Sequence, residues 1–241
     1  MSERSSRFIT TRWTQVIAAR DKNSPECREA LEALCRAYRS PLYAYARRSG
    51  LAPHDADDAT QAFFAKLLRH DWLDAADPTK GRFRTFLAVA MKRFLANERD
   101  RASALKRGGM ETPLAPDEIE TEERRLADTA LPPDPDEAFD RRWARTLLDG
   151  VMASLKADYV RNGEESTFEC LKNCLVAGRG EIPYAGVAAR AGLSEGAARV
   201  AVSRMRKRFR DLFREAVAAT VADAGDIDAE SRHIARVLAE G

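Results

Sequence analysis

The sequence predicts an all-α protein in which two helical domains are joined by a flexible acidic linker. Apolar residues recur three and four positions apart along nearly the whole chain, which is the spacing of one helix face. Alternating apolar and polar patterns, which are typical of strands, are missing. Prolines and acidic residues accumulate between residues 103 and 135. We therefore expect domains at residues 10–102 and 136–222, a linker at 103–135 and a C-terminal helical extension at 223–241.

The charges are distributed unevenly along the chain, although the net charge is only +2. Residues 1–109 carry 21 basic and 13 acidic side chains, residues 110–140 carry 2 and 11, and residues 141–241 carry 17 and 14. Two basic lobes are thus joined by an acidic connector. Basic lobes of this kind favour an anionic partner such as nucleic acid.

Several classes of protein are disfavoured by what the sequence lacks. Apolar runs of membrane-spanning length and the apolar core of a secretory signal are missing. The four cysteines lie in helical patterns without the histidine or second cysteine pair that would complete a tetrahedral metal site. We therefore expect a cytoplasmic protein with free thiols, no metal, no cofactor, no catalytic residue and no membrane partner.

The first domain begins with a short helix at residues 11–20 and continues with a second helix from about residue 26. Pro41 predicts an interruption of that helix, because proline lacks the backbone N–H of a helical residue. A third helix begins at Pro53. Its first turn carries Asp55, Asp57 and Asp58, which complement the positive end of the helix dipole.

A basic helix is predicted at residues 81–101. Phe83 and Arg84 stand at its start, and its polar side carries Lys92, Arg93, Asn97 and Arg99. Cations neutralise phosphates and aromatic rings accept unstacked bases, so this helix suits a nucleic-acid strand. An amphipathic core helix with a solvated basic face is the alternative interpretation.

A helix-turn-helix is predicted in the second domain. A short helix at residues 184–191 is followed by a turn that contains Gly192, and Ser194 caps a long helix from residue 195 to about residue 220. The exterior of the long helix is rich in cations and hydroxyls, namely Arg199, Ser203, Arg204, Arg206, Lys207, Arg208 and Arg210. We expect this surface to contact DNA. The tail from residue 226 to residue 240 predicts one more amphipathic helix, which we expect to cap the second core.

These three segments together resemble a bacterial RNA polymerase sigma factor of the extracytoplasmic-function class. Residues 55–64 are similar to the acidic segment in the second part of that family's conserved region 2, and residues 81–101 to the segments that melt and bind the −10 promoter element. Residues 184–210 resemble the helix-turn-helix of region 4. The likeness covers nearly all of residues 10–220 and extends to a subset of longer members found in bacteria with many eukaryotic-like kinases.

The resemblance implies core RNA polymerase as a partner. The family docks on the coiled coil of the largest polymerase subunit, through positions that fall in this chain on Asp55, Asp57, Asp58 and Gln61. The docking surface of polymerase is basic, so exposed carboxylates steer association and fix its register. The alternative role for these aspartates is helix-dipole complementation alone.

The resemblance also implies promoter DNA as a partner, both as duplex and as melted strand. The −10 element is expected to contact Phe83, Arg84, Lys92, Arg93, Asn97 and Arg99. The −35 element is expected to lie along Ser194, Glu195, Arg199, Ser203, Arg204 and Lys207. Of the two rings near the start of the basic helix, we expect Phe86 in the core and Phe83 exposed to hold an extruded base.

The sequence departs from the family pattern at Ala62, where an acid is usual, and at Thr60, where an aliphatic residue is usual. Phosphorylation of Thr60 would restore negative charge one turn from Asp57, which makes Thr60 a candidate phosphorylation site that switches on polymerase binding. A threonine that is merely tolerated in the helix is the alternative. A Ser/Thr kinase that acts on Thr60, or an anti-sigma factor, is a further candidate partner.

Two other classes of function compete with this interpretation. A helix-turn-helix transcription regulator that acts without polymerase docking would bind duplex DNA as an isolated protein. An enzyme with His54, Asp55, Asp57 and Asp58 as a metal cluster would need convergent ligands, a phosphate-binding glycine loop or a nucleophile and base pair, which the sequence lacks.

Overall fold

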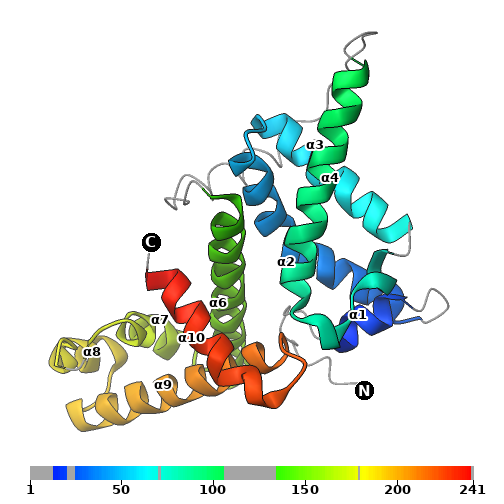
Figure 1. Ribbon diagram of the computed structural model, residues 1–241. Coiled ribbons are helices and arrows are strands. Elements are labelled where there is room, and N and C mark those ends of the chain that lie inside the picture. Colours follow the sequence, from blue (N-terminus) through cyan, green and yellow to red (C-terminus); the bar gives the residue numbers. More distant parts are fainter. Residues whose placement is uncertain (1–12, 21–24, 70–71, 106–133, 179, 240–241) are drawn as a thin grey trace. The chain divides into compact units, whose positions relative to one another are not determined.

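The computed structural model describes residues 13–20, 25–69, 72–105, 134–178 and 180–239. Within these ranges every regular element is a helix and no residue forms a strand (Figure 1), so the predicted all-α fold is confirmed. The α-helices are α1 (Trp13–Arg20), α2 (Cys27–Arg48), α3 (Pro53–Arg69), α4 (Phe83–Leu105), α6 (Pro135–Arg161), α7 (Glu165–Leu171), α8 (Tyr184–Ala191), α9 (Glu195–Ala218) and α10 (Ile227–Ala239). Short 3-10 turns are η1 (Trp72–Ala75), η2 (Pro78–Lys80), η3 (Lys172–Leu175) and η4 (Ala224–Asp226).

The described residues divide into two compact units. The larger unit holds residues 13–147 and 217–239, and the smaller unit holds Leu148–Ala216. The division therefore falls inside α6 and near the end of α9. The sequence-based division assigns residues 136–147 to the second domain instead. Most of the predicted linker, residues 106–133, lies outside the described residues.

The core of the larger unit is formed by α1 to α4. Helices α1 and α3 pack on α2, and α4 packs on both α2 and α3. Phe63 of α3 is fully buried, with its ring centroid 5.7 Å from that of Phe94 on α4 and 6.1 Å from that of Trp72. Leu87, Met91 and Leu95, which lie four residues apart on α4, are buried on the same face, as the apolar spacing predicts.

Pro41 does not interrupt α2, so the predicted break is wrong. The helix continues from Cys27 to Arg48 with Pro41 inside it. Proline removes one backbone hydrogen bond from the helix. The residues that follow it, Leu42, Tyr43, Ala44, Tyr45 and Ala46, are all buried, and this packing holds the second half of α2 in line.

The first turns of α6 and the tail helix α10 belong to the larger unit. The ring of Phe139 on α6 stacks on Tyr38 of α2 at a centroid distance of 6.3 Å, and Arg142 Nε donates to Ser40 Oγ at 2.6 Å. Ala44 and Ala138 are small, fully buried and in contact, so the backbones of α2 and α6 can approach closely. The expectation that the tail helix caps the second core is therefore wrong.

The smaller unit contains the helix-turn-helix. Helix α7 packs on α8, and the inner face of α9 is formed by Ala198, Val202 and Met205, all buried as predicted. Arg206 was expected on the cationic exterior, but it is half-buried. Its Nε donates to the Cys174 carbonyl at 3.0 Å, and a terminal guanidinium nitrogen also donates to the carbonyl of Ala177. Arg206 thus closes the end of η3 rather than facing solvent.

Two further observations concern the part of the chain that the structure describes. None of its helices is long and apolar enough to cross a membrane. Its four cysteines are free thiols, with Cys27 and Cys174 buried and Cys35 and Cys170 half-buried. Burial raises the pKa of the Cys35 thiol, and the negative charge of Glu32 adds to the effect, so this thiol favours its protonated form.

Candidate polymerase and nucleic-acid interfaces

An acidic rim surrounds a cavity between α3 and α4. The cavity has a volume of about 350 Å³, and its polar rim is formed by Asp55, Asp58, Glu98 and Arg99. The rest of its lining is apolar and includes Leu95 and Phe94. Asp55 is exposed and Asp58 is half-buried, so both carboxylates are accessible to a partner. Such a surface can receive an apolar side chain flanked by cations.

Asp57 faces the other way, which corrects the expectation of a third exposed carboxylate. It is 5% exposed, and it accepts a hydrogen bond from a guanidinium nitrogen of Arg39 at 3.0 Å and another from Gln61 Nε2 at 2.7 Å. Gln61 itself is exposed. Asp57 therefore ties α3 to α2 and orients Gln61, because its carboxylate is paired inside the protein.

Thr60 is also inside the larger unit. Its side chain is 1% exposed, and its hydroxyl donates to the carbonyl of Ala56 at 2.7 Å. Bonding to the carbonyl one turn earlier is a common arrangement for a threonine within a helix. The structure thus corrects the prediction of a phosphate acceptor on the docking face, because a kinase would not reach this hydroxyl in the folded chain.

The polar side of α4 is exposed along its middle and C-terminal turns. Lys92, Arg93, Asn97 and Arg99 are all exposed, as predicted. Arg99 donates to the carbonyl of Ser49. Nearby, Lys66 Nζ lies 2.7 Å from a Glu98 carboxylate oxygen, and this bond, more than any other contact, lowers the pKa of Glu98. Apart from Glu98 and the exposed Asp100, this face presents cations and an amide to solvent, which suits a nucleic-acid backbone.

The start of α4 is buried, which corrects the expectation for Phe83 and Arg84. Phe83 is 2% exposed, and its ring lies 5.6 Å from Tyr38 and 5.9 Å from Trp13 between centroids. Phe86 is half-buried and stacks on Phe83 at 5.8 Å. Phe83 is thus the more buried of the two rings, which is the reverse of the prediction, because helix α1 and Tyr38 cover it.

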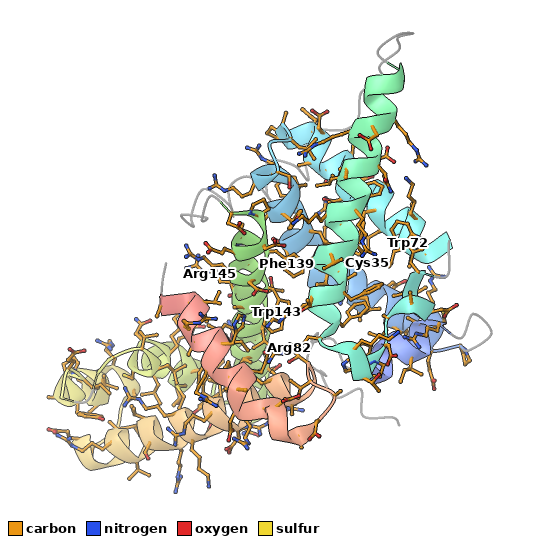
Figure 2. All side chains as sticks on the ribbon, viewed as in Figure 1. Cys35, Trp72, Arg82, Phe139, Trp143 and Arg145 are labelled. Atoms are coloured by element: carbon orange, nitrogen blue, oxygen red, sulfur yellow. The ribbon has the colours of Figure 1, made fainter. Side chains whose placement is uncertain are left out.

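Arg84 is the centre of a buried charge network. Its terminal nitrogen Nη1 donates to Asp140 of α6 at 2.5 Å, and its Nε donates to Glu230 of α10 at 3.1 Å. Its guanidinium lies 4.7 Å from the ring centre of Trp143. Burial alone would lower the pKa of Arg84, but the carboxylates of Asp140 and Glu230 raise it, and the net shift is upward. The side chain is therefore a fixed cation. Figure 2 labels Trp143 and Phe139 one turn apart on α6.

The helix-turn-helix in the smaller unit has the predicted turn. Gly192 ends α8 in the left-handed region, with φ of 65°, which favours glycine. Ser194 then caps α9, because the backbone N–H of Ala197 donates to Ser194 Oγ at 3.2 Å. The predicted −35 residues are all exposed, namely Ser194, Glu195, Arg199, Ser203, Arg204 and Lys207.

Arg199 is held in place by two neighbours. One of its guanidinium nitrogens lies 2.6 Å from a Glu195 carboxylate oxygen, and the guanidinium carbon lies 4.2 Å from the ring centre of Tyr184 on α8. Both contacts fix the direction of an exposed cation near the start of α9, the second helix of the helix-turn-helix. The sequence did not reveal the role of Tyr184, although its spacing before the turn placed it on the adjacent helix.

Ser194→Ala is expected to lower the free energy of unfolding of the smaller unit by about 1 kcal/mol, because it leaves the N–H of Ala197 without its cap. Chemical denaturation followed by circular dichroism measures the change. Ser203→Ala is the matched control, since Ser203 is exposed in the middle of α9 and alanine favours a helix there. Equal stability of the two variants would contradict the capping role.

The comparison with known families agrees with the geometry of α2, α3 and α4. The family model described as Sigma-70 region 2 matches residues 34–104, which is less than a third of the chain. Residues 34–104 are thus similar to sigma-70 region 2. No curated protein and no solved structure was found to match the chain.

The matched residues contain the acidic rim and the basic face of α4, but not all the residues that surround Arg84. Asp140, Glu230 and Trp143, which surround Arg84, lie outside the matched residues. This network was not predicted from the sequence. A signal for it was present, because Glu230 lies between Ile227 and Ile234 on what should be the apolar stripe of α10. An acid on an inner helix face indicates a buried cationic partner.

The metal-cluster interpretation finds no support in the described residues. No group of three or more histidine, cysteine, aspartate or glutamate side chains is placed there to hold a metal ion. His54 and Asp55 are exposed, whereas Asp57 is turned inward toward Arg39. The three carboxylates of this turn therefore do not converge on one point.

Proposed function

We propose that this protein is an alternative sigma factor of the extracytoplasmic-function class, which binds core RNA polymerase and directs promoter recognition and DNA melting in the cytoplasm. The observation that carries the proposal is the coincidence of the region 2 match with the acidic rim of α3 and the exposed basic face of α4. A sigma factor needs one surface for polymerase and another for the melted strand, and region 2 offers both.

The polymerase surface is assigned to Asp55 and Asp58, which line the cavity between α3 and α4, and to the exposed Gln61 of α3. The apolar lining of this cavity and its accessible carboxylates complement a basic helix surface that carries an apolar side chain. Asp57 contributes indirectly, because its bond to Gln61 Nε2 holds that side chain in place.

The promoter surfaces are assigned to the two basic helices. Lys92, Arg93, Asn97 and Arg99 on α4 are exposed, so they can follow the displaced strand of the −10 element. On α9, the exposed Arg199, Ser203, Arg204 and Lys207 can enter the major groove of the −35 element.

In-vitro transcription with core RNA polymerase tests the proposal. Fragmented genomic DNA from the source organism supplies the templates, so that all of its promoters are present, and the 5′ ends of the transcripts identify the start sites. New start sites that need both the protein and core polymerase are expected. Binding of duplex sites by the isolated protein, without any start site in the presence of core, would instead favour a regulator that acts without polymerase docking.

The double variant Asp55→Lys with Asp58→Lys is expected to weaken core-polymerase binding at least ten-fold, because it reverses both accessible carboxylates on the cavity rim. Affinity measured by fluorescence anisotropy of the labelled full chain checks this. Asp74→Lys makes the same chemical change at an exposed position of region 2 outside this cavity, and is expected to bind within about two-fold of wild type. Equal loss in both variants would contradict the assigned surface.

A further inference from the structure

The tail helix α10 contacts the start of the strand-binding helix α4. Glu230 of α10 is 0% exposed. One of its carboxylate oxygens lies 2.9 Å from Arg82 Nε, and the other lies 3.1 Å from Arg84 Nε. Both arginines belong to region 2, whereas Glu230 lies far outside the matched residues. Figure 2 labels Arg82 beside the start of α4.

Glu230 stands on the inner face of α10 in a position where an apolar residue would be expected. Ile234, one turn later on the same face, is also fully buried. A buried carboxylate is tolerated only when cations or hydrogen-bond donors replace its lost water. Here the donors are two guanidinium groups at the start of α4. The contact between α10 and α4 is therefore made by matched charge and not by apolar packing alone.

The same guanidinium groups would suit a DNA strand. Guanidinium groups bind carboxylate and phosphate through the same pairs of N–H donors, so one can take the place of the other. Arg82 and Arg84 directly precede the exposed basic face of α4, and Arg84 is among the residues expected at the −10 element. While Glu230 and Asp140 hold these arginines, they are closed to phosphate.

We propose that α10 is an intramolecular lock on the strand-binding face of region 2, in which Glu230 takes the place of a DNA phosphate between Arg82 and Arg84. The lock rests on the proposed sigma-factor function, because it needs a strand site to close. Asp140 completes it from α6, and Trp143 covers the guanidinium of Arg84. A melted strand and Glu230 then compete for the same two cations, so the strand gains full access only when α10 leaves.

The full chain with Glu230→Gln tests the lock, because it keeps the shape of the side chain and removes its charge. The probe is a fluorescein-labelled oligothymidine of twenty nucleotides, and affinity is read by anisotropy. Glu230→Gln is expected to bind about ten-fold more tightly than wild type. Asp226→Asn removes the same charge from an exposed position one turn earlier, and is expected to bind within about two-fold of wild type.

A measurement on the wild-type chain does not depend on the fold of a variant. Hydrogen exchange of the α10 amides is expected to become faster when a saturating amount of the oligonucleotide is bound. Unchanged or slower exchange in α10 would overturn the lock, as would equal affinities of wild type and Glu230→Gln. Failure of both proteins to bind the strand would also overturn it.

The outcome separates the lock from the function on which it rests. Transcription with core polymerase tests the sigma-factor assignment by itself. If start sites appear but the oligonucleotide affinities are equal, the lock alone is wrong. If Glu230→Gln tightens strand binding but no start site appears with core, the sigma-factor assignment is wrong and the contact still closes a strand site.

Discussion

Phe63→Ala is expected to lower the free energy of unfolding of the larger unit by about 3 to 5 kcal/mol. Phe63 is fully buried, and its ring lies within 6.1 Å of the rings of Phe64, Phe94 and Trp72 between centroids. Removal of the ring leaves a cavity at the junction of α3, α4 and η1, and these helices cannot close it without losing other contacts. Because folded domains are stable by only about 5 to 15 kcal/mol, the variant is expected to be close to unfolding.

The experiment is urea denaturation of the full chain followed by circular dichroism and by tryptophan fluorescence. Trp72, with its ring centroid 6.1 Å from Phe63, reports on this part of the core. Val89→Ala is the matched control, since Val89 lies on the exposed side of α4 at 44% exposure, and its stability is expected to change by less than about 0.5 kcal/mol. A loss below about 1 kcal/mol for Phe63→Ala would show that this ring is not central to the core.

Arg84→Ala is expected to destabilise the larger unit by a similar amount, about 3 to 5 kcal/mol, for an electrostatic reason. The change leaves the buried carboxylate of Glu230 and the half-buried carboxylate of Asp140 without the guanidinium that both of them contact. Glu230 keeps Arg82 as a partner at 2.9 Å, and Asp140 keeps His233 at 3.1 Å, which carries a charge only when it is protonated. A buried charge that has lost its partner costs more than the pair contributed.

Thermal and urea denaturation of Arg84→Ala and Arg93→Ala compare a buried and an exposed arginine of the same helix. Arg93→Ala is expected to change the stability by less than about 0.5 kcal/mol. Arg84→Lys should recover only part of the loss, because a single ammonium group cannot reproduce the fork of a guanidinium that bonds two carboxylates. Full stability in Arg84→Ala would mean that solvent reaches the network, and it would also remove the structural basis of the lock.

The helices were predictable because their apolar spacing is a local property of the sequence. The stripe of Leu87, Met91 and Leu95 on α4 indicated both the helix and its buried face. Pro41 is an exception. A local rule predicts a break there, but the packing of the buried residues that follow Pro41 outweighs one lost hydrogen bond, and packing against distant helices cannot be read from neighbouring residues.

The candidate site was predictable on its exposed side only. Lys92 and Arg93 on α4 and Arg204 on α9 are exposed, as a polar helix face predicts. Phe83 and Arg84 were expected at the surface, yet they are covered by residues far away in the sequence. Arg84 and Glu230 are 146 positions apart. Periodicity shows which residues share a face, but not which distant helix covers that face.

The bonds that arginines of α9 make within the protein reduce the expected salt dependence of its affinity for duplex DNA. Arg206 donates to the carbonyls of Cys174 and Ala177, and Arg208 lies 2.7 Å from Asp158. An arginine that is held by carbonyls of its own chain, or paired with a carboxylate of its own chain, releases few ions from a DNA backbone when a complex forms. The dependence of affinity on ionic strength is set by the count of phosphates newly neutralised. A count of the basic residues in this helix therefore overstates how steeply a complex of α9 with duplex DNA would weaken as salt is added.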